Sequence, residues 1–171
     1  MSPILETERL RLRPVTDDDF DHFAALYGDP DVMRFIGARG ALTREQTRDR
    51  LDFMIDHWLR HGFGMWALFR KADGTFVGRC GMRYLDQTTD VELGYTLSKA
   101  SWGQGFATEA SRAVVRYAFE VMKIGRLVAI ADPANTPSVN VMKKIGMTFE
   151  RMGRFYETEC VLYAMTAAAV D

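Results

Sequence analysis

Polar and apolar positions alternate near the start of the chain and then take up a helical spacing. Residues 9–14 alternate arginine with leucine or proline, which predicts a strand. Thr16 or Asp17 is expected to cap a helix that continues to about Tyr27. The break at 28–30, Gly-Asp-Pro, separates this helix from an irregular span.

A second predicted helix begins at Thr43, which stands before Gln46 in the spacing of a capping box. Apolar residues recur every three or four positions along this helix, so we expect one face to be buried. Gly62 and Gly64 are expected to end it. The predicted buried stripe consists of Leu51, Met54, Ile55, Trp58 and Leu59.

The middle of the chain predicts strands of one sheet. Residues 65–70 and 76–85 are mostly apolar, and the pair Asp73-Gly74 between them is typical of a hairpin turn. Residues 91–97 alternate apolar and polar side chains, which continues the sheet.

The remaining elements alternate helices with strands and complete one α/β domain, expected to span residues 1–171. The predicted order is β-α-α-β-β-β-α-β-α-β-β. The elements are a helix over 105–122 closed by Gly125, an apolar strand at 126–131, a short helix that Ser138 caps and Gly146 ends, and two strands near 147–152 and 160–165.

Composition and charge narrow the classes of function. The 171 residues are 47% hydrophobic and 26% charged, which is typical of a globular protein. Lys+Arg 22 against Asp+Glu 23 gives a formal net charge of -1, so no basic field favours nucleic acid or a membrane. Cys80 and Cys160 stand far apart, and the first residues read as a strand rather than a targeting peptide. We therefore expect free thiols in a cytoplasmic protein.

The segment "WGQGFATEA" at 102–110 places two glycines between a predicted strand and a helix. It lacks the Gly-Lys-Ser/Thr of a phosphate-binding P-loop. It departs from the dinucleotide fingerprint because Thr108 occupies the third glycine place and no acidic residue follows about 20 residues later. What remains is an anion site for a diphosphate, where glycines allow close backbone approach and helix amides face the charge. A simple chain turn is the alternative.

The same segment resembles the GNAT N-acetyltransferases, whose motif Gln/Arg-x-x-Gly-x-Gly/Ala lies at a strand-helix junction. Gly105 and Ala107 match the small residues of this motif, and Trp102 stands in the Gln/Arg place. The resemblance implies the GNAT fold, a mixed and mostly antiparallel sheet that is splayed at its centre and flanked by helices.

Other segments are similar to one branch of that superfamily, which contains ribosomal-protein N-terminal and spermidine acetyltransferases. They are "TERLRLRP" at 7–14, "ELGY" at 92–95 and "NTPSVNVMKKIGM" at 135–147. The resemblance spans nearly the whole chain in the right order. It is specific for fold and cofactor and unspecific for the acceptor.

The resemblance implies acetyl-coenzyme A as co-substrate. Its pantetheine arm would lie like an extra strand beside residues 95–97, and Gly94 is expected to mark a bulge that splays two parallel strands. Asn135 would hydrogen-bond the arm, with a plain turn residue as the alternative, and Ser138 would begin the next helix. The expected cofactor-binding residues are Tyr95, Thr96, Leu97, Trp102, Gly103, Gln104, Gly105, Phe106, Ala107, Thr108, Asn135 and Ser138.

Acetyl transfer requires a neutral amine and a group that protonates the leaving thiolate. Glu92 is the expected base, directly or through water, because it stands where the resembling lysine acetyltransferases carry their glutamate. A solvated or salt-bridged strand glutamate is the alternative. The place of the family's tyrosine falls on Met142, which cannot donate a proton, so Ser138, Tyr156 or water must act on the thiolate.

The predicted activity is N-acetylation of a primary amine, which could belong to a protein N-terminus, a polyamine or a small molecule. The methionine at the tyrosine place favours one alternative, a non-catalytic coenzyme A-binding sensor or scaffold. His57 and His61 are four apart on a predicted helix, but the sequence offers them no further ligands, so no metal site is expected. The acceptor should depend on residues 29–42 and the final strands, and a homodimer is an ordinary expectation.

Overall fold

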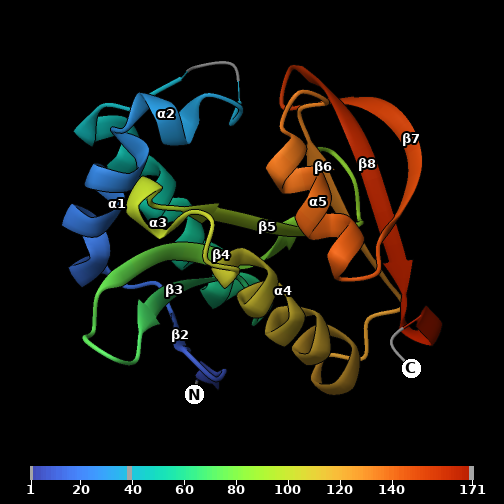
Figure 1. Cartoon of the computed structure of the whole chain (residues 1–171), viewed down its shortest axis with the longest axis horizontal. Coiled ribbons are helices and arrows are strands. Elements are labelled where there is room, and N and C mark those ends of the chain that lie inside the picture. The colour runs from blue at the N-terminus through green and yellow to red at the C-terminus, as the bar shows by residue number, and fades with distance from the viewer. Residues whose placement is uncertain (1, 38–39, 170–171) are drawn as a thin grey trace.

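The computed structural model describes residues 2–37 and 40–169, which form one mixed sheet with helices on both faces (Figure 1). The strand order is β1-β2-β3-β4-β5-β6-β8-β7, and neighbours are antiparallel except for the parallel pair β5 and β6. This confirms the predicted mixed, mostly antiparallel sheet. The strands are β1 (Leu5–Glu6), β2 (Leu10–Pro14), β3 (Met65–Arg70), β4 (Phe76–Tyr84), β5 (Val91–Leu97), β6 (Arg126–Ala131), β7 (Thr148–Phe155) and β8 (Thr158–Thr166).

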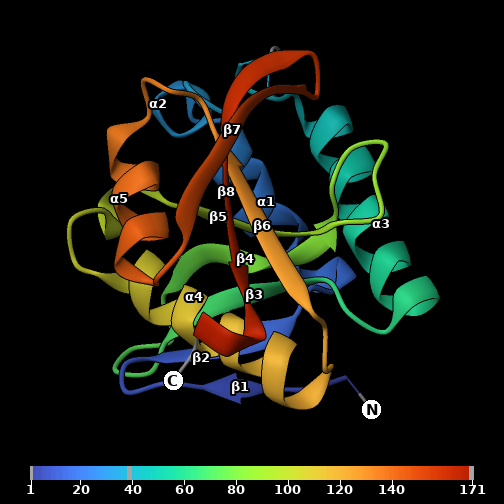
Figure 2. The same ribbon diagram turned by 90° about the vertical axis from the view of Figure 1, so that its right-hand side faces the viewer.

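The helices lie on opposite sides of the strands, with α3 on one side and α4 and α5 on the other (Figure 2). They are α1 (Phe20–Tyr27), α2 (Pro30–Met33), α3 (Arg44–His61), α4 (Phe106–Arg116) and α5 (Thr136–Lys144), with short 3-10 turns at Asp17–Asp19, Lys99–Ser101 and Ala167–Ala169. The sequence did not predict β1 or α2, which are short. The helix expected over 105–122 divides into α4 and a π-helical turn at Tyr117–Val121.

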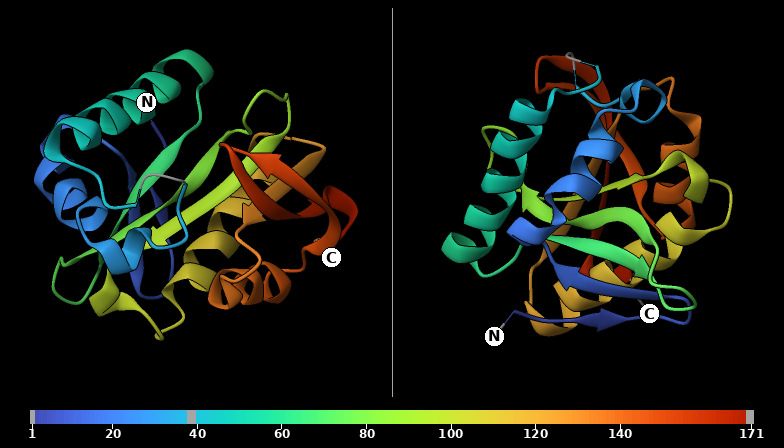
Figure 3. Two further views of the ribbon diagram at one scale, coloured as in Figure 1. Left: turned by 90° about the horizontal axis from the view of Figure 1, so that it is seen from above. Right: turned by 90° about the vertical axis from the view of Figure 1, so that its left-hand side faces the viewer.

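Helix α3 follows the predicted capping signals. Thr43 Oγ1 accepts from the Gln46 amide at 3.1 Å, and the Gln46 side chain accepts from the Thr43 amide at 2.9 Å. Gly62 ends the helix with a φ of 73°. The expected buried stripe is wrong at Leu59, which is 81% exposed. Its neighbour Trp58 occupies the buried face. Because successive helical residues are rotated by about 100°, the Leu59 side chain points toward solvent. Helix α1 lies beside α3 (Figure 3).

The sheet opens between β5 and β6. Their parallel ladder holds only two pairs, Val91 with Leu127 and Glu92 with Val128, and the strands then diverge. The bulge expected at Gly94 is wrong, because β4 and β5 keep an unbroken register across it. The splay therefore arises where the β6 ladder ends, and the β5 edge beyond it has main-chain groups directed away from β4.

Alternate residues of β4 and β5 face different helices. Cys80 faces α4, where its Sγ lies 3.7 Å from Ser111 Oγ. Arg79 faces α1, and its Nε donates to the Tyr27 hydroxyl at 2.6 Å. Because strand side chains alternate, Glu92 shares the α1 face with Arg79. The two faces of these central strands can therefore serve different parts of one site.

The last third of the chain forms β6, α5 and a long hairpin. Ser138 was expected to cap α5, but the cap is Asn135, whose side-chain oxygen accepts from the Ser138 amide at 3.4 Å. Strands β7 and β8 are longer than predicted and meet at a turn where Tyr156 and Glu157 have positive φ. None of the described helices is long and apolar enough to cross a bilayer.

Candidate active site

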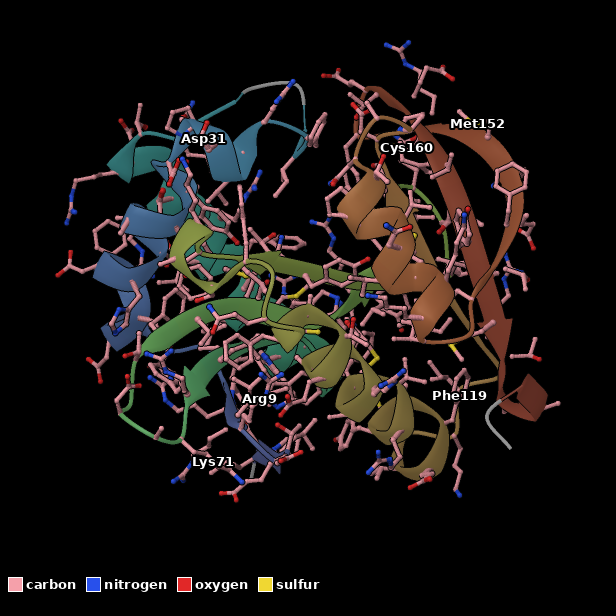
Figure 4. The ribbon with its side chains drawn as sticks, in the orientation of Figure 1. Arg9, Asp31, Lys71, Phe119, Met152 and Cys160 are labelled. Carbon is pink, nitrogen blue, oxygen red and sulfur yellow. The ribbon has the colours of Figure 1, made fainter. Side chains whose placement is uncertain are left out.

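A cavity of about 950 Å³ lies where β5 and β6 separate. Its walls come from α2 and the residues after it, from β5, from the glycine loop, from the start of α5 and from the β7-β8 turn. Figure 4 shows Asp31 in α2 and Cys160 in β8, and both residues line this cavity from opposite sides. Segments far apart in the sequence thus meet around one space.

Both glycines of the 102–110 segment adopt left-handed backbone angles. Gly103 has a φ of 72° and Gly105 a φ of 80°, values that are costly for residues with a Cβ. Gly105 is the N-cap residue of α4, so the first amides of that helix begin directly after it. An N-terminus of this kind, next to a cavity, is suited to hold an anion such as a diphosphate.

The other residues predicted to bind the cofactor from this loop either line the cavity or hydrogen-bond the neighbouring main chain. Trp102 lines the cavity and donates from Nε1 to the Leu97 carbonyl at 3.0 Å. Gln104 turns back along the loop and donates to the Ala100 carbonyl at 3.1 Å. Phe106 is buried, and Ala107 and Thr108 line the cavity from the first turn of α4.

Arg9 and Glu109 hold this loop in place, a role that sequence analysis missed. The Arg9 amide donates to Glu109 Oε1 at 2.8 Å and its Nε to Oε2 at 2.7 Å, while Nη1 donates to the Gln104 carbonyl at 2.8 Å. The hydroxyl of Thr7 also donates to Glu109 at 2.6 Å. The available signal was the resemblance of "TERLRLRP", which marked these residues without a reason for them.

Tyr95 and Ser138 bridge the two sides of the splay. The Tyr95 hydroxyl donates to the Ser138 carbonyl at 2.7 Å, and Ser138 Oγ donates to the Tyr95 hydroxyl at 3.1 Å. Burial raises the pKa of the Tyr95 phenol, so it stays protonated at neutral pH. Near this bridge, the buried hydroxyl of Thr96 has no hydrogen-bond partner among the described residues. Tyr95, Thr96, Leu97, Asn135 and Ser138 all line the cavity.

Glu92 is 4% exposed and lies at the closed end of the splay. Its Oε2 accepts from Arg83 Nε at 2.9 Å and from the Tyr156 hydroxyl at 3.1 Å. Burial, followed by the charge of Glu92, raises the pKa of Tyr156. The carboxylate is thus buried and salt-bridged, and it lines the cavity together with both of its partners. Sequence analysis missed Arg83, although residues 79 and 83 share one face of β4 with Glu92 across from them.

Two further sequence expectations concern Met142 and the histidines. Met142 is 1% exposed and belongs to the hydrophobic core. His57 is buried, with Nδ1 2.8 Å from the Phe63 carbonyl, and burial lowers its pKa. Within 2–37 and 40–169, no group of three or more His, Cys, Asp or Glu side chains could hold a metal ion.

The expected acceptor segments meet the same cavity. Val32, Phe35 and Ile36 line it from the 29–42 segment, and Thr158 and Cys160 line it from β8. Residues 38–39 of that segment lie outside the described residues. The cavity therefore has a glycine-loop side suited to an anion and a second side formed by residues of the 29–42 segment and of β8.

Several known proteins are similar to this chain in sequence or in fold. The sequence profile of the family described as Acetyltransferase (GNAT) domain matches residues 9–148. The Bacillus subtilis protein YkkB is 33% identical over 162 residues, which cover 93% of each chain. The N-acetyltransferase p20 of Bacillus licheniformis is 30% identical over 154 residues, which cover 90% of this chain and 86% of p20. The crystal structure of an acetyltransferase from Agrobacterium tumefaciens has a TM-score of 0.84 at 28% identity and covers 95% of this chain and 94% of its own.

Proposed function

Because the chain belongs to the GNAT acetyltransferase family, we propose that it transfers an acetyl group from acetyl-coenzyme A to a primary amine. The acceptor amine would belong to a protein N-terminus, a polyamine or a small molecule, and residues 1–171 would act as one N-acetyltransferase domain. The observation that carries this proposal is the divergence of β5 from β6 beside a helix N-terminus exposed by two left-handed glycines.

The residues present fit the proposed co-substrate. The α4 amides after Gly105 are suited to its diphosphate, and the β5 edge beyond Glu92 can pair with an amide-bearing arm. The unpartnered Thr96 hydroxyl and the side chain of Asn135 supply further polar groups on this path. When bound, acetyl-coenzyme A supplies a thioester whose acyl carbon accepts the amine.

Glu92 is the proposed base in this mechanism. At pH 7 an α-amine of pKa about 8 costs about 1.4 kcal/mol to deprotonate, and a lysine-like amine near 10.4 costs about 4.6 kcal/mol. The buried carboxylate, which accepts hydrogen bonds from Arg83 and Tyr156, would take this proton directly or through a water molecule.

Ser138 is the proposed proton donor to the departing thiolate, since Met142 cannot act, and the serine hydroxyl takes a replacement proton from solvent water as it gives up its own. Its hydroxyl lines the cavity and already participates in the hydrogen-bonded pair with Tyr95. Protonating a thiolate of pKa about 8.5 at pH 7 contributes only about 2 kcal/mol, so a modest donor is sufficient.

We further infer that the protein acts in the cytoplasm and without a metal, nucleic acid or membrane partner. The support is the formal net charge of -1 and the two cysteines, which are both free and buried. A homodimer is a separate expectation that light scattering of the purified protein tests.

The function is tested with purified protein, acetyl-coenzyme A and an amine panel that includes peptides beginning with Ser or Ala and spermidine. The release of free thiol is monitored with a colorimetric thiol reagent, and coenzyme A binding is measured by calorimetry. We expect binding together with amine-dependent thiol release. Tight binding without turnover on any amine would favour the sensor or scaffold, and no binding would contradict the whole proposal.

A further inference from the structure

Arg79 lies in the cavity on the face of the sheet opposite α4. It is 6% exposed, and its Nε donates to the Tyr27 hydroxyl at 2.6 Å while Nη1 lies 3.3 Å from Met65 Sδ. A phenol and a thioether are its hydrogen-bond partners, and no carboxylate within 2–37 or 40–169 forms an ion pair with it. A buried guanidinium without a counter-charge is costly, which indicates that an anion completes its surroundings.

The other charges on this face do not neutralise Arg79. Arg83 and Glu92 pair with each other at 2.9 Å, so the carboxylate of Glu92 is already engaged. Arg50 of α3 lines the same cavity, with its guanidinium carbon 5.2 Å from the Tyr27 ring. Although the chain as a whole has a net charge of -1, this part of the cavity has an excess of positive charge. Two arginines of β4, Arg79 and Arg83, stand against one glutamate of β5, Glu92.

The guanidinium lies over the middle of β5. A Cβ placed on Gly94 would stand 3.4 Å from Arg79 Nη1, so the absence of a side chain at this position leaves room for the guanidinium. Gly94 follows Glu92 by two residues on the same face, a spacing of about 7 Å along a strand. Arg79 is directed toward α1 and β3, away from the α4 N-terminus proposed for the diphosphate.

We propose that the acceptor is a small amine with an anionic group, a carboxylate or a phosphate, which Arg79 binds while the amine lies near Glu92. This inference rests on the proposed transferase function and narrows its acceptor. Two extended residues span at most about 7 Å, which is also the strand spacing between Glu92 and Gly94, the β5 residue beside the Arg79 guanidinium, so a dipeptide with a free carboxylate has a suitable length. A polycation such as spermidine does not match, because it would meet Arg79 with like charge.

Calorimetry on protein saturated with coenzyme A tests this inference without turnover. Ser-Ala is compared with Ser-Ala amide, and phosphoethanolamine with ethanolamine, so that each pair differs by one anionic group. We expect the anionic member of at least one pair to bind at least about tenfold tighter, as for other hydrogen bonds to charged groups. The pair that shows the preference distinguishes carboxylate from phosphate. No preference in either pair, or tighter binding of spermidine, overturns the inference.

Variants of Arg79 test whether this side chain causes the preference for the anionic ligand. Arg79→Gln should remove the preference and Arg79→Lys should retain part of it, while coenzyme A still binds. Arg60→Gln is the matched control, since it removes an exposed arginine of α3 that pairs with Asp56. A preference unchanged in Arg79→Gln would overturn the assignment. If Arg79→Gln does not fold, the comparison on the unaltered protein decides.

Thiol release with acetyl-coenzyme A, measured on the same panel, separates the two proposals. A binding preference without thiol release in the presence of any amine upholds Arg79 as the binding site for an anionic group and contradicts the transferase, so that the bound molecule is a ligand and not an acceptor. Thiol release without a binding preference upholds the transferase and contradicts the anionic acceptor.

Discussion

Arg9 and Glu109, which are 100 positions apart in the sequence, form an ion pair between the turn that precedes β2 and the first turn of α4, and the Arg9 amide donates to the same carboxylate. The same arginine donates to the Gln104 carbonyl and lies over the Phe106 ring, with 4.3 Å between its guanidinium carbon and the ring centroid. The glycine loop is therefore held from outside by the turn between β1 and β2, near the N-terminus of the chain. Its amides are held in place before any ligand arrives.

Glu109→Gln should destabilise the protein by about 1–3 kcal/mol at pH 7, because donors of Thr7 and Arg9 lose a charged acceptor. The measurement is the free energy of unfolding in denaturant. Glu150→Gln is the control, since Glu150 pairs with Arg126 on the surface and should change stability little. Coenzyme A affinity should fall only in Glu109→Gln.

The loss in Glu109→Gln should depend on pH. Burial raises the pKa of the Glu109 carboxyl, but hydrogen bonds from Thr7 and Arg9 outweigh burial and hold it below its ordinary value. A lowered folded-state pKa contributes stability above the unfolded pKa of about 4.3, and this stability is lost as pH falls through the folded pKa. The difference in the free energy of unfolding between the unaltered protein and Glu109→Gln should therefore become smaller as the pH falls. A constant gap from neutral to strongly acidic pH would contradict this account.

Gly105→Glu should weaken coenzyme A binding by at least about tenfold while the protein stays folded. The added carboxylate repels a diphosphate, and the φ of 80° strains any residue with a Cβ. Gly105→Ala separates strain from charge. Gly74→Ala is the control, because Gly74 has a similar φ of 71° in the β3-β4 turn, away from the cavity. If Gly105→Glu keeps its affinity for coenzyme A, the glycine loop is not part of the coenzyme A site.

Glu92→Gln should reduce turnover by about 10²–10⁴-fold at pH 7 and by much less at pH 9, where more of the amine is already neutral. The pH profile of kcat/KM measures this difference. Glu159→Gln makes the same change on an exposed position of β8 and should leave the profile unaltered. An equal loss at both pH values would show that Glu92 positions other groups rather than removing a proton.

Ser138→Ala should lower kcat by no more than about thirtyfold, because protonating the thiolate is worth only about 2 kcal/mol at pH 7. Coenzyme A affinity, measured by calorimetry, should change little. Tyr156→Phe should instead alter the pH profile, since its hydroxyl donates to Glu92. An unaltered kcat in Ser138→Ala, with a large loss in Tyr156→Phe, would transfer the donor role to Tyr156.

The sequence by itself determined those features that depend on residues within a few positions of one another. The Thr43 capping box, the Asp73-Gly74 turn and the glycine loop before α4 are of this kind, because backbone angles and nearby hydrogen bonds decide them. The resemblance added the fold and the cofactor. The errors at Leu59 and at the α5 cap arose because neighbouring residues fit one local pattern nearly equally well: Leu59 directly follows the buried Trp58, and the capping residue Asn135 precedes Ser138 by three positions.

Only the tertiary structure decided the contacts that build the site. Glu92 meets Tyr156 because β5 and the β7-β8 turn converge at the closed end of the splay, and Tyr95 meets Ser138 because α5 lies across it. Arg79 looks like an ordinary strand residue until α1 and β3 surround its charge with neutral partners. Local sequence fixes each element, but the desolvation that makes these side chains chemically distinctive depends on what other elements pack around them.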